Sequence, residues 1–428
     1  MASSAFARLP GFRDFPPEDL ALRSLIFEAW RRTSQRYGFL EYDGPPLESL
    51  DLYVEKSGQE IVGQLYNFVD KGERNVTLRP EMTPSLARIL GDRSRGMSKP
   101  IRWFSIPQLF RYERQQRGRL KEHFQWNVDI IGESGVAADV EVVAVGIDGL
   151  RALGLTSGDF VARVSDRRLL TVLLGALGVT HEQLAGTFAL VDKLERQPRD
   201  KSRAHLTDQL GLDASAADQV LALLDDSGLE ALADRYGDRD DVGAALEPLR
   251  EYVASLEAMG LGDFVEVDLK IVRGLAYYTG IVFEFFDRKG ELRAICGGGR
   301  YDRLLELVGG EALPAVGFGM GDVVLGELLS DRGLVPEYER SLDYFLVLVS
   351  EEQRSDALRL AHRLREAGKT VAYPLSERGV GKQMKAAARE GAREVVILGP
   401  DELARDCVLV RDMVSGEQRE TRLDELGE

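Results

Sequence analysis

Alternating apolar and polar positions predict antiparallel strands in the first half of the chain. One alternating run covers Trp103–Arg111, and a second returns through the apolar positions Phe124, Trp126, Val128 and Ile130. A polar, basic segment, Arg114–Gly118, separates the two runs and ends on a glycine suited to a turn. We therefore predict an antiparallel hairpin within Phe110–Gly132.

One face of this predicted hairpin carries Arg111, Glu113, Gln125 and Asp129. A guanidinium group suits phosphate, and carboxylates suit an ammonium group. The pattern is therefore typical of a site for a polyanion together with an amine. A solvated ribbon with cross-strand charge pairs has the same pattern, and this segment alone leaves both interpretations open.

The segment that precedes this hairpin is predicted to contain helices and two short strands. The apolar positions Leu22, Ile26, Ala29, Trp30, Thr33 and Tyr37 predict an amphipathic helix. Leu65–Val69 and Val76–Arg79 predict two short strands that lead into Glu81-Met82-Thr83 and a helix over Pro84–Leu90. Glu81 is suited either to capping that helix or to binding an ammonium group.

A change of pattern marks the middle of the chain. The predicted helix Ala137–Leu153 and strand Phe160–Val164 are followed by a Leu/Ala/Asp-rich helical block over 167–260. An all-helical block within a β-rich chain predicts an inserted domain. Its basic cluster consists of Lys193, Arg196, Arg199, Lys201 and Arg203, and such a cluster is most often a solvated face.

The remaining candidate functional residues lie in segments that contain several glycines. The predicted strands Phe264–Leu269 and Ile281–Phe286 bracket a turn that contains Arg273, Tyr277 and Tyr278. Next come Cys296–Asp302, whose glycines clear room for a small ligand, and Pro314–Leu325, a glycine-rich strand that runs into a helix.

The last part of the chain alternates strands and helices. The pattern predicts strands at Tyr344–Val349, Val371–Tyr373, Glu394–Leu398 and Val408–Met413, with helices at Glu352–Ala367 and Gly381–Gly391. We predict an α+β protein: a catalytic domain over 1–166 and 261–330, a helical insertion over 167–260, a linker over 331–342, and a small α/β domain over 343–428.

Composition narrows the classes of function. The 428 residues carry a net charge of −16, which argues against nonspecific coating of nucleic acid by the whole chain but allows a local basic track. The two cysteines, Cys296 and Cys407, lie far apart, so we expect no structural zinc. The sequence shows no signal peptide and no membrane-spanning apolar run, so we expect a cytoplasmic protein.

The motifs together resemble those of class II aminoacyl-tRNA synthetases, and of the histidyl-tRNA synthetase family in particular. FRYE, a loop and GRLKEHFQ are similar to motif 2, the RPEMT segment is similar to an RPE-x-T turn, and RGLAYY is similar to the histidine-specific RGL-x-YY turn. The fold implied is a class II antiparallel sheet with a helical insertion and a C-terminal anticodon-binding domain. Pro45 best matches the proline of motif 1, which implies a homodimer.

The resemblance also implies roles for residues. Arg111 and Arg273 would be catalytic and lie against the α-phosphate of ATP and the histidine carboxylate. The implied histidine site consists of Glu81, Met82, Thr83, Arg111, Gln125, Asp129, Arg273, Tyr277 and Tyr278. The implied ATP site consists of Arg111, Glu113, Arg119 and the rings of His123 and Phe124, either of which could stack on adenine. The candidates for tRNA contact are Arg114, Gln115, Gln116 and Arg117.

Four positions depart from the family pattern. His123 occupies the position of the aromatic residue that usually stacks on adenine. Val324 occupies the position of the motif 3 arginine that normally clamps ATP, and Arg300 or Arg303 is a candidate to replace its charge. Asp129 is one methylene shorter than the commoner glutamate, and Ala276 replaces an acidic residue.

The implied reaction is ligation of L-histidine to tRNA(His), with ATP as a substrate and Mg²⁺ as its counterion; the metal ligands are unknown. The missing motif 3 arginine favours an alternative, a non-catalytic histidine-sensing protein like the regulatory subunit of ATP phosphoribosyltransferase. Arg273 and the C-terminal domain argue against it. A class II synthetase for another amino acid is a third reading, which Tyr277 and Tyr278 disfavour.

Overall fold

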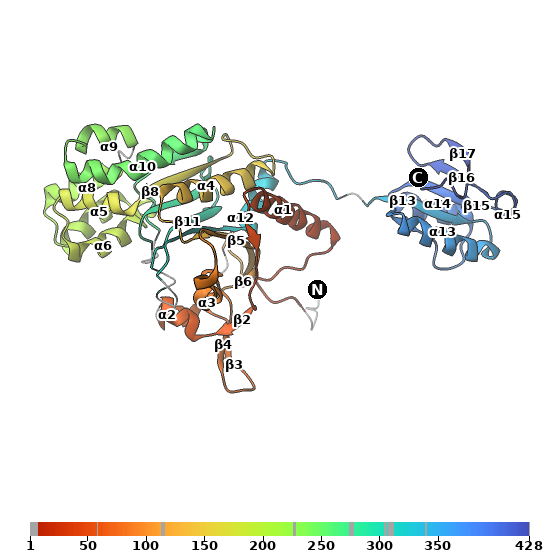
Figure 1. Ribbon diagram of the computed structural model, residues 1–428, viewed down its shortest axis with the longest axis horizontal. Helices are drawn as coiled ribbons and strands as arrows, with labels where there is room; N and C mark the ends of the chain where they lie inside the picture. Colours follow the sequence, from red (N-terminus) through yellow and green to blue (C-terminus); the bar gives the residue numbers. More distant parts are fainter. Residues whose placement is uncertain are drawn as a thin grey trace. The chain divides into compact units, whose positions relative to one another are not determined.

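The computed structural model describes residues 7–57, 59–112, 116–225, 228–273, 278–303, 306, 312–338 and 340–427. Its contacts divide the chain into two compact units, Met1–Val335 and Pro336–Glu428 (Figure 1). The division falls inside the predicted linker, because helix α12 ends at Asp331 and strand β13 begins at Leu342.

The larger unit is built on a nine-stranded sheet. The strand order is β1-β5-β7-β12-β11-β10-β8-β9, and β6 pairs with β7 off this path. The strands are β1 (Leu40–Glu41), β5 (Ile101–Ser105), β6 (Gln108–Phe110), β7 (Glu122–Ile131), β8 (Phe160–Asp166), β9 (Val265–Val267), β10 (Ile281–Asp287), β11 (Cys296–Arg300) and β12 (Ala315–Gly321). The central pairs are antiparallel, and the outer pairs β1–β5 and β8–β9 are parallel. The predicted antiparallel sheet and α+β class are confirmed.

The predicted strand Trp103–Arg111 is two strands, and in this respect the prediction was wrong. Residues Ile101–Ser105 and Gln108–Phe110 both pair with β7 in one continuous register. Pro107 lies between them and has no N–H to donate, so the strand is interrupted there. The β6–β7 hairpin itself is confirmed.

A three-stranded sheet lies beside the main one (Figure 1). It consists of β2 (Leu47–Ser49), β4 (Asn75–Leu78) and β3 (Asn67–Val69), in that order. The connecting helices are α2 (Asp51–Ser57), η1 (Gln59–Gln64), α3 (Thr83–Arg93) and η2 (Ser94–Gly96). The sequence pattern predicted β3, β4 and α3 and missed α2.

Two helices cover one face of the main sheet. In α1 (Pro17–Arg36), Trp30 is fully buried and stacks on Trp126 of β7 with ring centroids 5.8 Å apart. In α4 (Val136–Arg151), a Cβ atom at Gly149 would overlap the Trp126 ring, so this glycine lets the helix lie close to the sheet.

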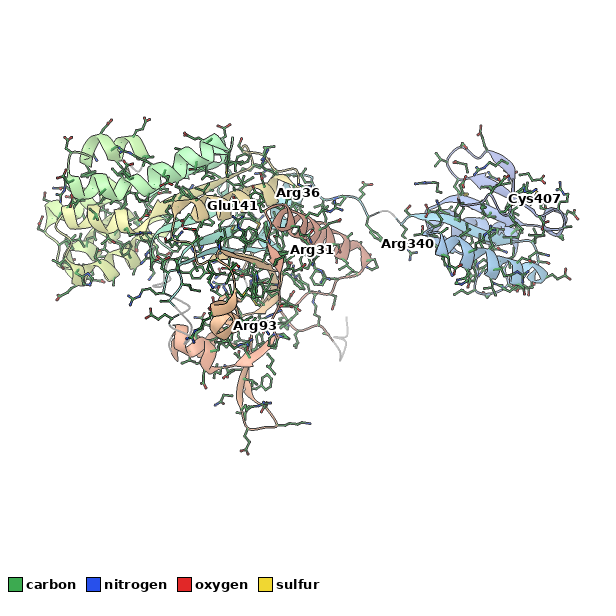
Figure 2. All side chains as sticks on the ribbon, in the orientation of Figure 1. Arg31, Arg36, Arg93, Glu141, Arg340 and Cys407 are labelled. Atoms are coloured by element: carbon green, nitrogen blue, oxygen red, sulfur yellow. The ribbon has the colours of Figure 1, made fainter. Side chains whose placement is uncertain are left out.

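Ion pairs fasten the same helices to the edge of the sheet. Arg31 of α1 donates to Glu41 of β1 at 2.8 Å, and Glu141 of α4 accepts from Arg102 of β5 at 2.6 Å. Figure 2 labels Arg31 and Glu141 on their helices. Because these pairs are partly exposed, each contributes at most about 1 kcal/mol.

The helical block between β8 and β9 shares its core with the sheet. Its elements are α5 (Arg167–Ala176), α6 (His181–Val191), η3 (Leu194–Arg196), α7 (Arg199–Ala204), η4 (His205–Gln209), α8 (Ala214–Asp225), α9 (Leu229–Tyr236) and α10 (Asp240–Ala258), and η5 (Gly262–Phe264) follows. Buried side chains of α10, such as Leu246 and Leu249, belong to the same apolar cluster as Phe283 and Phe285 of β10. The separate insertion domain therefore stays a prediction.

The smaller unit is a mixed α/β domain. Its sheet order is β14-β13-β15-β16-β17, with parallel pairs on both sides of β13 and antiparallel pairs beyond β15. Its elements are β13 (Leu342–Leu348), η6 (Glu351–Gln353), α13 (Arg354–Glu366), β14 (Val371–Ala372), α14 (Val380–Arg389), β15 (Ala392–Leu398), α15 (Pro400–Leu403), β16 (Cys407–Asp412) and β17 (Gln418–Arg422). The predicted order is confirmed, with α15 and β17 in addition.

Candidate active site

Strand β7 carries its candidate chemistry on one face of the main sheet. Side chains alternate along a strand, so His123, Gln125 and Asp129 share a face and Trp126 lies on the other. Trp126 stacks on Trp30 of α1, which identifies its face as the one that the helices cover. The three polar side chains therefore point away from α1.

Phe124 lies on the helix-covered face and not on the candidate ATP face. Its ring packs edge-on against Phe15 and Phe27, with centroids 6.2 and 5.1 Å away, and the Arg23 guanidinium lies 4.9 Å from its centre. The expectation that Phe124 belongs to the ATP site is therefore wrong. His123 is left as the candidate ring for adenine.

His123 is a neutral imidazole. Burial first, and then the charges of Arg111, Arg13 and Arg119, together lower its pKa to about 3. The ring is consequently uncharged at neutral pH. An uncharged ring can stack on the face of a purine without placing another cation among these arginines.

Glycines of β12 make room for Gln125 and Asp129. Gly317 pairs with Asp129 across the strands, and a Cβ atom there would overlap Asp129 Oδ1 and lie 2.6 Å from the Val128 carbonyl oxygen. A Cβ atom at Gly319 would lie 2.6 Å from Gln125 Cδ. These glycines thus accommodate side chains of the neighbouring strand.

Tyr301 holds Asp129 in place. Its hydroxyl group donates a hydrogen bond to Asp129 Oδ1, and the two residues are 3% and 4% exposed. Fixing one carboxylate oxygen also fixes the direction in which the other oxygen points. Sequence reasoning missed this residue, although it lies in the glycine-rich segment that the resemblance singled out.

Arg273 lies over strand β11. Its Nη1 donates to Glu284 Oε1 at 2.6 Å, and its guanidinium carbon lies 5.7 Å from the centre of the Tyr278 ring. The backbone of Arg273 has a φ of 48°, a left-handed conformation that is uncommon outside functional turns. A Cβ atom at Gly297 would overlap Arg273 Nη1, so this glycine leaves space for the guanidinium.

Arg111 connects the hairpin to the turn at Glu81–Thr83. Its Nε donates to the Pro80 carbonyl oxygen at 3.1 Å. Arg79, at the start of the same turn, is 4% exposed and donates to Asp43 Oδ1 at 2.7 Å. Two guanidinium groups therefore position this turn, one of them buried beneath it.

Met82 contributes no side chain to the candidate histidine site. It is fully buried, Arg79 Nη1 lies 3.8 Å from its sulfur, and its methyl group packs towards Gly44. Glu81 and Thr83 on either side are partly exposed. Any contact of Met82 with histidine would therefore come from its backbone.

The N-terminal segment adds an ion-pair cluster that sequence reasoning missed. Arg13 donates to Glu122 at 2.8 Å and to Asp322 at 2.9 Å, and Asp322 accepts from the backbone N–H of Phe124 at 2.9 Å. Burial raises the pKa of Asp322, and the Arg13 charge opposes that rise. The cluster joins β7 to the start of α12 (Asp322–Asp331).

The motif 2 loop packs against the same helix. Arg117 Nε and the Gly118 N–H donate to the two carboxylate oxygens of Glu327, each at 3.1 Å. A Cβ atom at Gly118 would lie 3.2 Å from Val324 Cγ2. The position expected to hold an ATP-binding arginine is therefore an apolar contact with the loop backbone.

Arg300 does not replace the missing arginine, and that expectation was wrong. The residue is 2% exposed, and its Nη2 donates to Asp139 at 2.6 Å while its Nη1 donates to the Glu133 carbonyl oxygen at 3.0 Å. These bonds lock it between β11 and α4. Arg303 is exposed and stays a candidate only by sequence.

Several predicted residues lie outside the described part of the chain: Glu113, Arg114, Gln115 and Tyr277. Gln116 and Arg117, the remaining candidates for tRNA contact, are exposed.

The described residues include no cluster of three or more His, Cys, Asp or Glu side chains that could hold a metal ion. None of the described helices is by itself long and apolar enough to cross a membrane, and only the bent pair α5 and α6 reaches that length and composition jointly.

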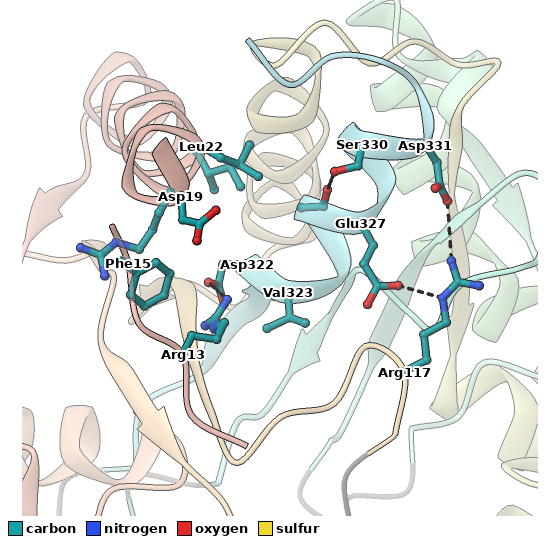
Figure 3. A pocket seen from close by; sticks show the side chains of 13 residues that line it. Arg13, Phe15, Asp19, Leu22, Arg117, Asp322, Val323, Glu327, Ser330 and Asp331 are labelled. Carbon is teal, nitrogen blue, oxygen red and sulfur yellow. Dashed lines mark hydrogen bonds and ion pairs between the residues drawn. The ribbon is translucent and has the colours of Figure 1, made fainter. Parts of the chain in front are cut away.

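A pocket of about 410 Å³ lies between α1 and α12, on the helix-covered side of β7 (Figure 3). Its lining includes Arg13, Phe15, Asp322 and Arg117, the last of which bonds Glu327. It contains neither Asp129 nor Arg273, so it is distinct from the candidate reaction centre.

Comparison with known proteins matches both units. The histidyl-tRNA synthetase family model matches residues 11–321, and an anticodon-binding domain model matches residues 343–428. The chain is 46% identical to a histidine–tRNA ligase of Opitutus terrae over 96% of this chain and 95% of the relative. It is 41% identical to a chloroplastic/mitochondrial histidine–tRNA ligase of Arabidopsis thaliana, over 97% of this chain and 85% of that one.

Solved structures of histidyl-tRNA synthetases have a similar fold. A histidyl-tRNA synthetase from Nostoc sp. PCC 7120 superposes with a TM-score of 0.82 at 25% identity, covering 99% of this chain and 98% of that chain. A Bacillus halodurans protein described as an ATP phosphoribosyltransferase regulatory subunit/histidyl-tRNA synthetase has a TM-score of 0.76 at 24% identity, covering 92% and 98%, and shows the fold alone. On these matches and this fold, the chain belongs to the histidyl-tRNA synthetase family.

Proposed function

We propose that the face of β7, β12 and β11 described above activates L-histidine with ATP and transfers the histidyl group to the 3′ end of tRNA(His). The protein is an aminoacyl-tRNA ligase, as its curated relatives are. The observation that carries the assignment of roles is the sheet order: Arg111 follows β6, which pairs with one side of β7, and Arg273 lies over β11, beyond β12 on the other side.

The histidine site is built from three kinds of group. Asp129, fixed by Tyr301, accepts a hydrogen bond from an imidazole nitrogen, and Tyr278 lies beside Arg273 at the same end. Glu81 and Thr83 supply the acceptors that an ammonium group needs. The neutral amide of Gln125 lies on the same face of β7 as Asp129 and can donate or accept a hydrogen bond to the amino acid.

The first reaction requires no covalent bond to the protein. The histidine carboxylate oxygen attacks the α-phosphorus of ATP, the bond to the β-phosphate oxygen breaks, and pyrophosphate leaves with that electron pair. The attacking oxygen must be positioned about 3 Å from phosphorus, and negative charge must be stabilised. Arg111 and Arg273 provide that stabilisation, each worth about 3–4 kcal/mol in the transition state.

When bound to ATP as its counterion, Mg²⁺ would supply positive charge to the pyrophosphate leaving group. Mg²⁺ bound to nucleotides takes most of its ligands from phosphate oxygens and water and one or two carboxylates from the protein. The carboxylates Glu122 and Asp322 are buried and engaged by Arg13, so they do not fit that role without rearrangement. We assign no metal ligand.

Exchange of labelled pyrophosphate into ATP, measured with each amino acid in turn, tests this function. We expect exchange with histidine alone, and charging of tRNA(His) with histidine. Histidine binding without exchange would instead favour the regulatory reading, and exchange with another amino acid would overturn the histidine assignment.

We propose that the C-terminal unit binds the anticodon of tRNA(His). We also propose that the protein acts as a homodimer in the cytoplasm. Removing residues 336–428 should reduce kcat/KM for charging at least about tenfold, a loss of about 1.4 kcal/mol, while pyrophosphate exchange changes little. The reason is that the residues proposed for adenylate formation all lie in the unit Met1–Val335, which is compact by its own contacts. Equal losses in both assays would contradict the assignment of this unit to tRNA.

A further inference from the structure

We propose that Arg167, the first residue of α5, is a positioning residue that holds Arg273 in place at the reaction centre. The inference rests on the proposed function, since that function gives Arg273 its role in adenylate formation. It also gives a role to the block of helices between β8 and β9. This block supplies Arg167 but none of the residues proposed to contact histidine or ATP.

The backbone of Arg167 joins the main sheet to α5. Strand β8 ends at Asp166, which lies opposite Ile281 at the start of β10. The Arg167 N–H continues this pairing, because it donates to the Gly280 carbonyl oxygen at 3.1 Å. Asp166 caps the helix, and its carboxylate accepts from the N–H groups of the next two residues after Arg167 at 2.6 and 3.1 Å. The position of Arg167 is therefore fixed by both the sheet and the helix.

The side chain of Arg167 reaches the other end of the same turn. Its Nη1 donates to the Val272 carbonyl oxygen at 2.6 Å and to the Arg273 carbonyl oxygen at 3.1 Å. Together with the backbone bond to Gly280, these contacts hold both ends of the segment 272–280. A guanidinium group suits this task because it carries five N–H donors in a fixed geometry.

The two carbonyl groups that Arg167 bonds flank the Cα atom of Arg273. The Val272 carbonyl belongs to the peptide group before that atom and the Arg273 carbonyl to the peptide group after it, so fixing both restrains φ and ψ of Arg273. The φ of Arg273 is 48°, a left-handed conformation that a residue other than glycine keeps only where its surroundings impose it. The direction of the Arg273 side chain follows from these two angles.

Arg273 is thereby held at both ends, by Arg167 at its backbone and by Glu284 at its guanidinium group. Arg167 in turn packs on α6, because its guanidinium carbon lies 4.5 Å from the centre of the Phe188 ring. Burial lowers the pKa of Arg167 and the phenol group of Tyr278 opposes that change, so Arg167 also lies near this proposed histidine-binding residue. Helices α5 and α6 are thus joined to the reaction centre through the Arg167 side chain.

A double-mutant cycle in the full chain tests whether Arg167 acts through Arg273. Arg167→Ala should lower kcat for histidine-dependent pyrophosphate exchange on the order of tenfold to a hundredfold, as expected when a reacting group moves by about 1 Å. The KM for ATP should change less than kcat, as for Arg273→Ala. In a chain that already carries Arg273→Ala, adding Arg167→Ala should lower exchange by less than about twofold, because that chain has no guanidinium left to position.

Two further variants serve as a rescue and a control. Arg167→Lys keeps the charge and can donate to the same carbonyl oxygens, so it should recover part of the lost activity. Arg163→Ala is the matched control, because Arg163 also joins β8 to the helical block, through an ion pair with Glu195 at 3.2 Å, and also lies over an aromatic ring, that of Phe286. Its ion pair lies outside the segment 272–280, so exchange should stay unchanged.

Equal fold losses in the two backgrounds would overturn the inference, since they would indicate a structural role of Arg167 that does not involve Arg273. A crystal structure of Arg167→Ala gives a readout that does not depend on turnover. We expect the Arg273 backbone to leave its left-handed conformation or the guanidinium to leave Glu284, and an unchanged Arg273 would overturn the inference. If Arg273 moves in this variant but the unmodified chain performs no histidine-dependent exchange, the proposed function is refuted and the positioning role of Arg167 is supported.

Discussion

Replacing Arg273 with alanine should lower histidine-dependent pyrophosphate exchange by about 10²–10³-fold, close to abolition, and leave the fold intact. The guanidinium stabilises the α-phosphate more strongly in the transition state, where negative charge builds up, than in bound ATP, so kcat should fall more than the affinity for ATP. Arg273 lies on a turn and its side chain is 21% exposed, so its loss opens no cavity in the core. Steady-state exchange and thermal unfolding measure the two effects separately.

Arg288→Ala is the matched control for this variant. Arg288 also bonds a glutamate, Glu266, at 2.5 Å, but at the far end of β10. Its removal should leave exchange unchanged. Full exchange activity in Arg273→Ala would remove this residue from the mechanism.

Gly317→Ala should weaken histidine binding on the order of a hundredfold, the cost of misplacing a binding group by about 1 Å. The new Cβ atom would overlap Asp129 Oδ1 and lie 2.6 Å from the Val128 carbonyl oxygen, so the carboxylate or the strand must move. The KM for histidine in the exchange assay, with the affinity for MgATP measured alongside, separates loss of the histidine site from loss of the whole sheet.

Gly326→Ala provides the control for the same change of residue. Its Cβ atom would lie 3.8 Å from Leu22 Cδ2, an ordinary contact, and alanine favours the helix in which it lies. We expect unchanged kinetics. If Gly317→Ala bound histidine as tightly as the unmodified chain, Asp129 would not be the imidazole partner.

Local patterns were sufficient to predict the elements on which the site is built. The alternation through Trp126 and Val128 predicted the hairpin. Because Phe124 lies two residues before Trp126, the same alternation places both side chains on one face of the strand. The resemblance allowed Phe124 to bind ATP, but the period of two already placed it with the apolar side chains. Here physical reasoning from the strand was the better guide.

Long-range contacts could not be read from local patterns. Arg13 meets Glu122 and Asp322 across 109 and 309 residues, and Arg300 meets Asp139 across 161. No spacing rule pairs such charges, because the pairing follows from the sheet order. The role of the β12 glycines could not be read from local patterns either, because they make room for side chains of the neighbouring strand.

A crystal structure with histidine and a non-hydrolysable ATP analogue is the most direct test of the central claim, that two arginines distant in sequence act on one phosphorus atom. We expect Arg111 and Arg273 both within hydrogen-bonding distance of the α-phosphate oxygens, and the imidazole ring between Asp129 and Tyr278. An α-phosphate contacted by neither guanidinium, or an imidazole bound elsewhere, would contradict the account.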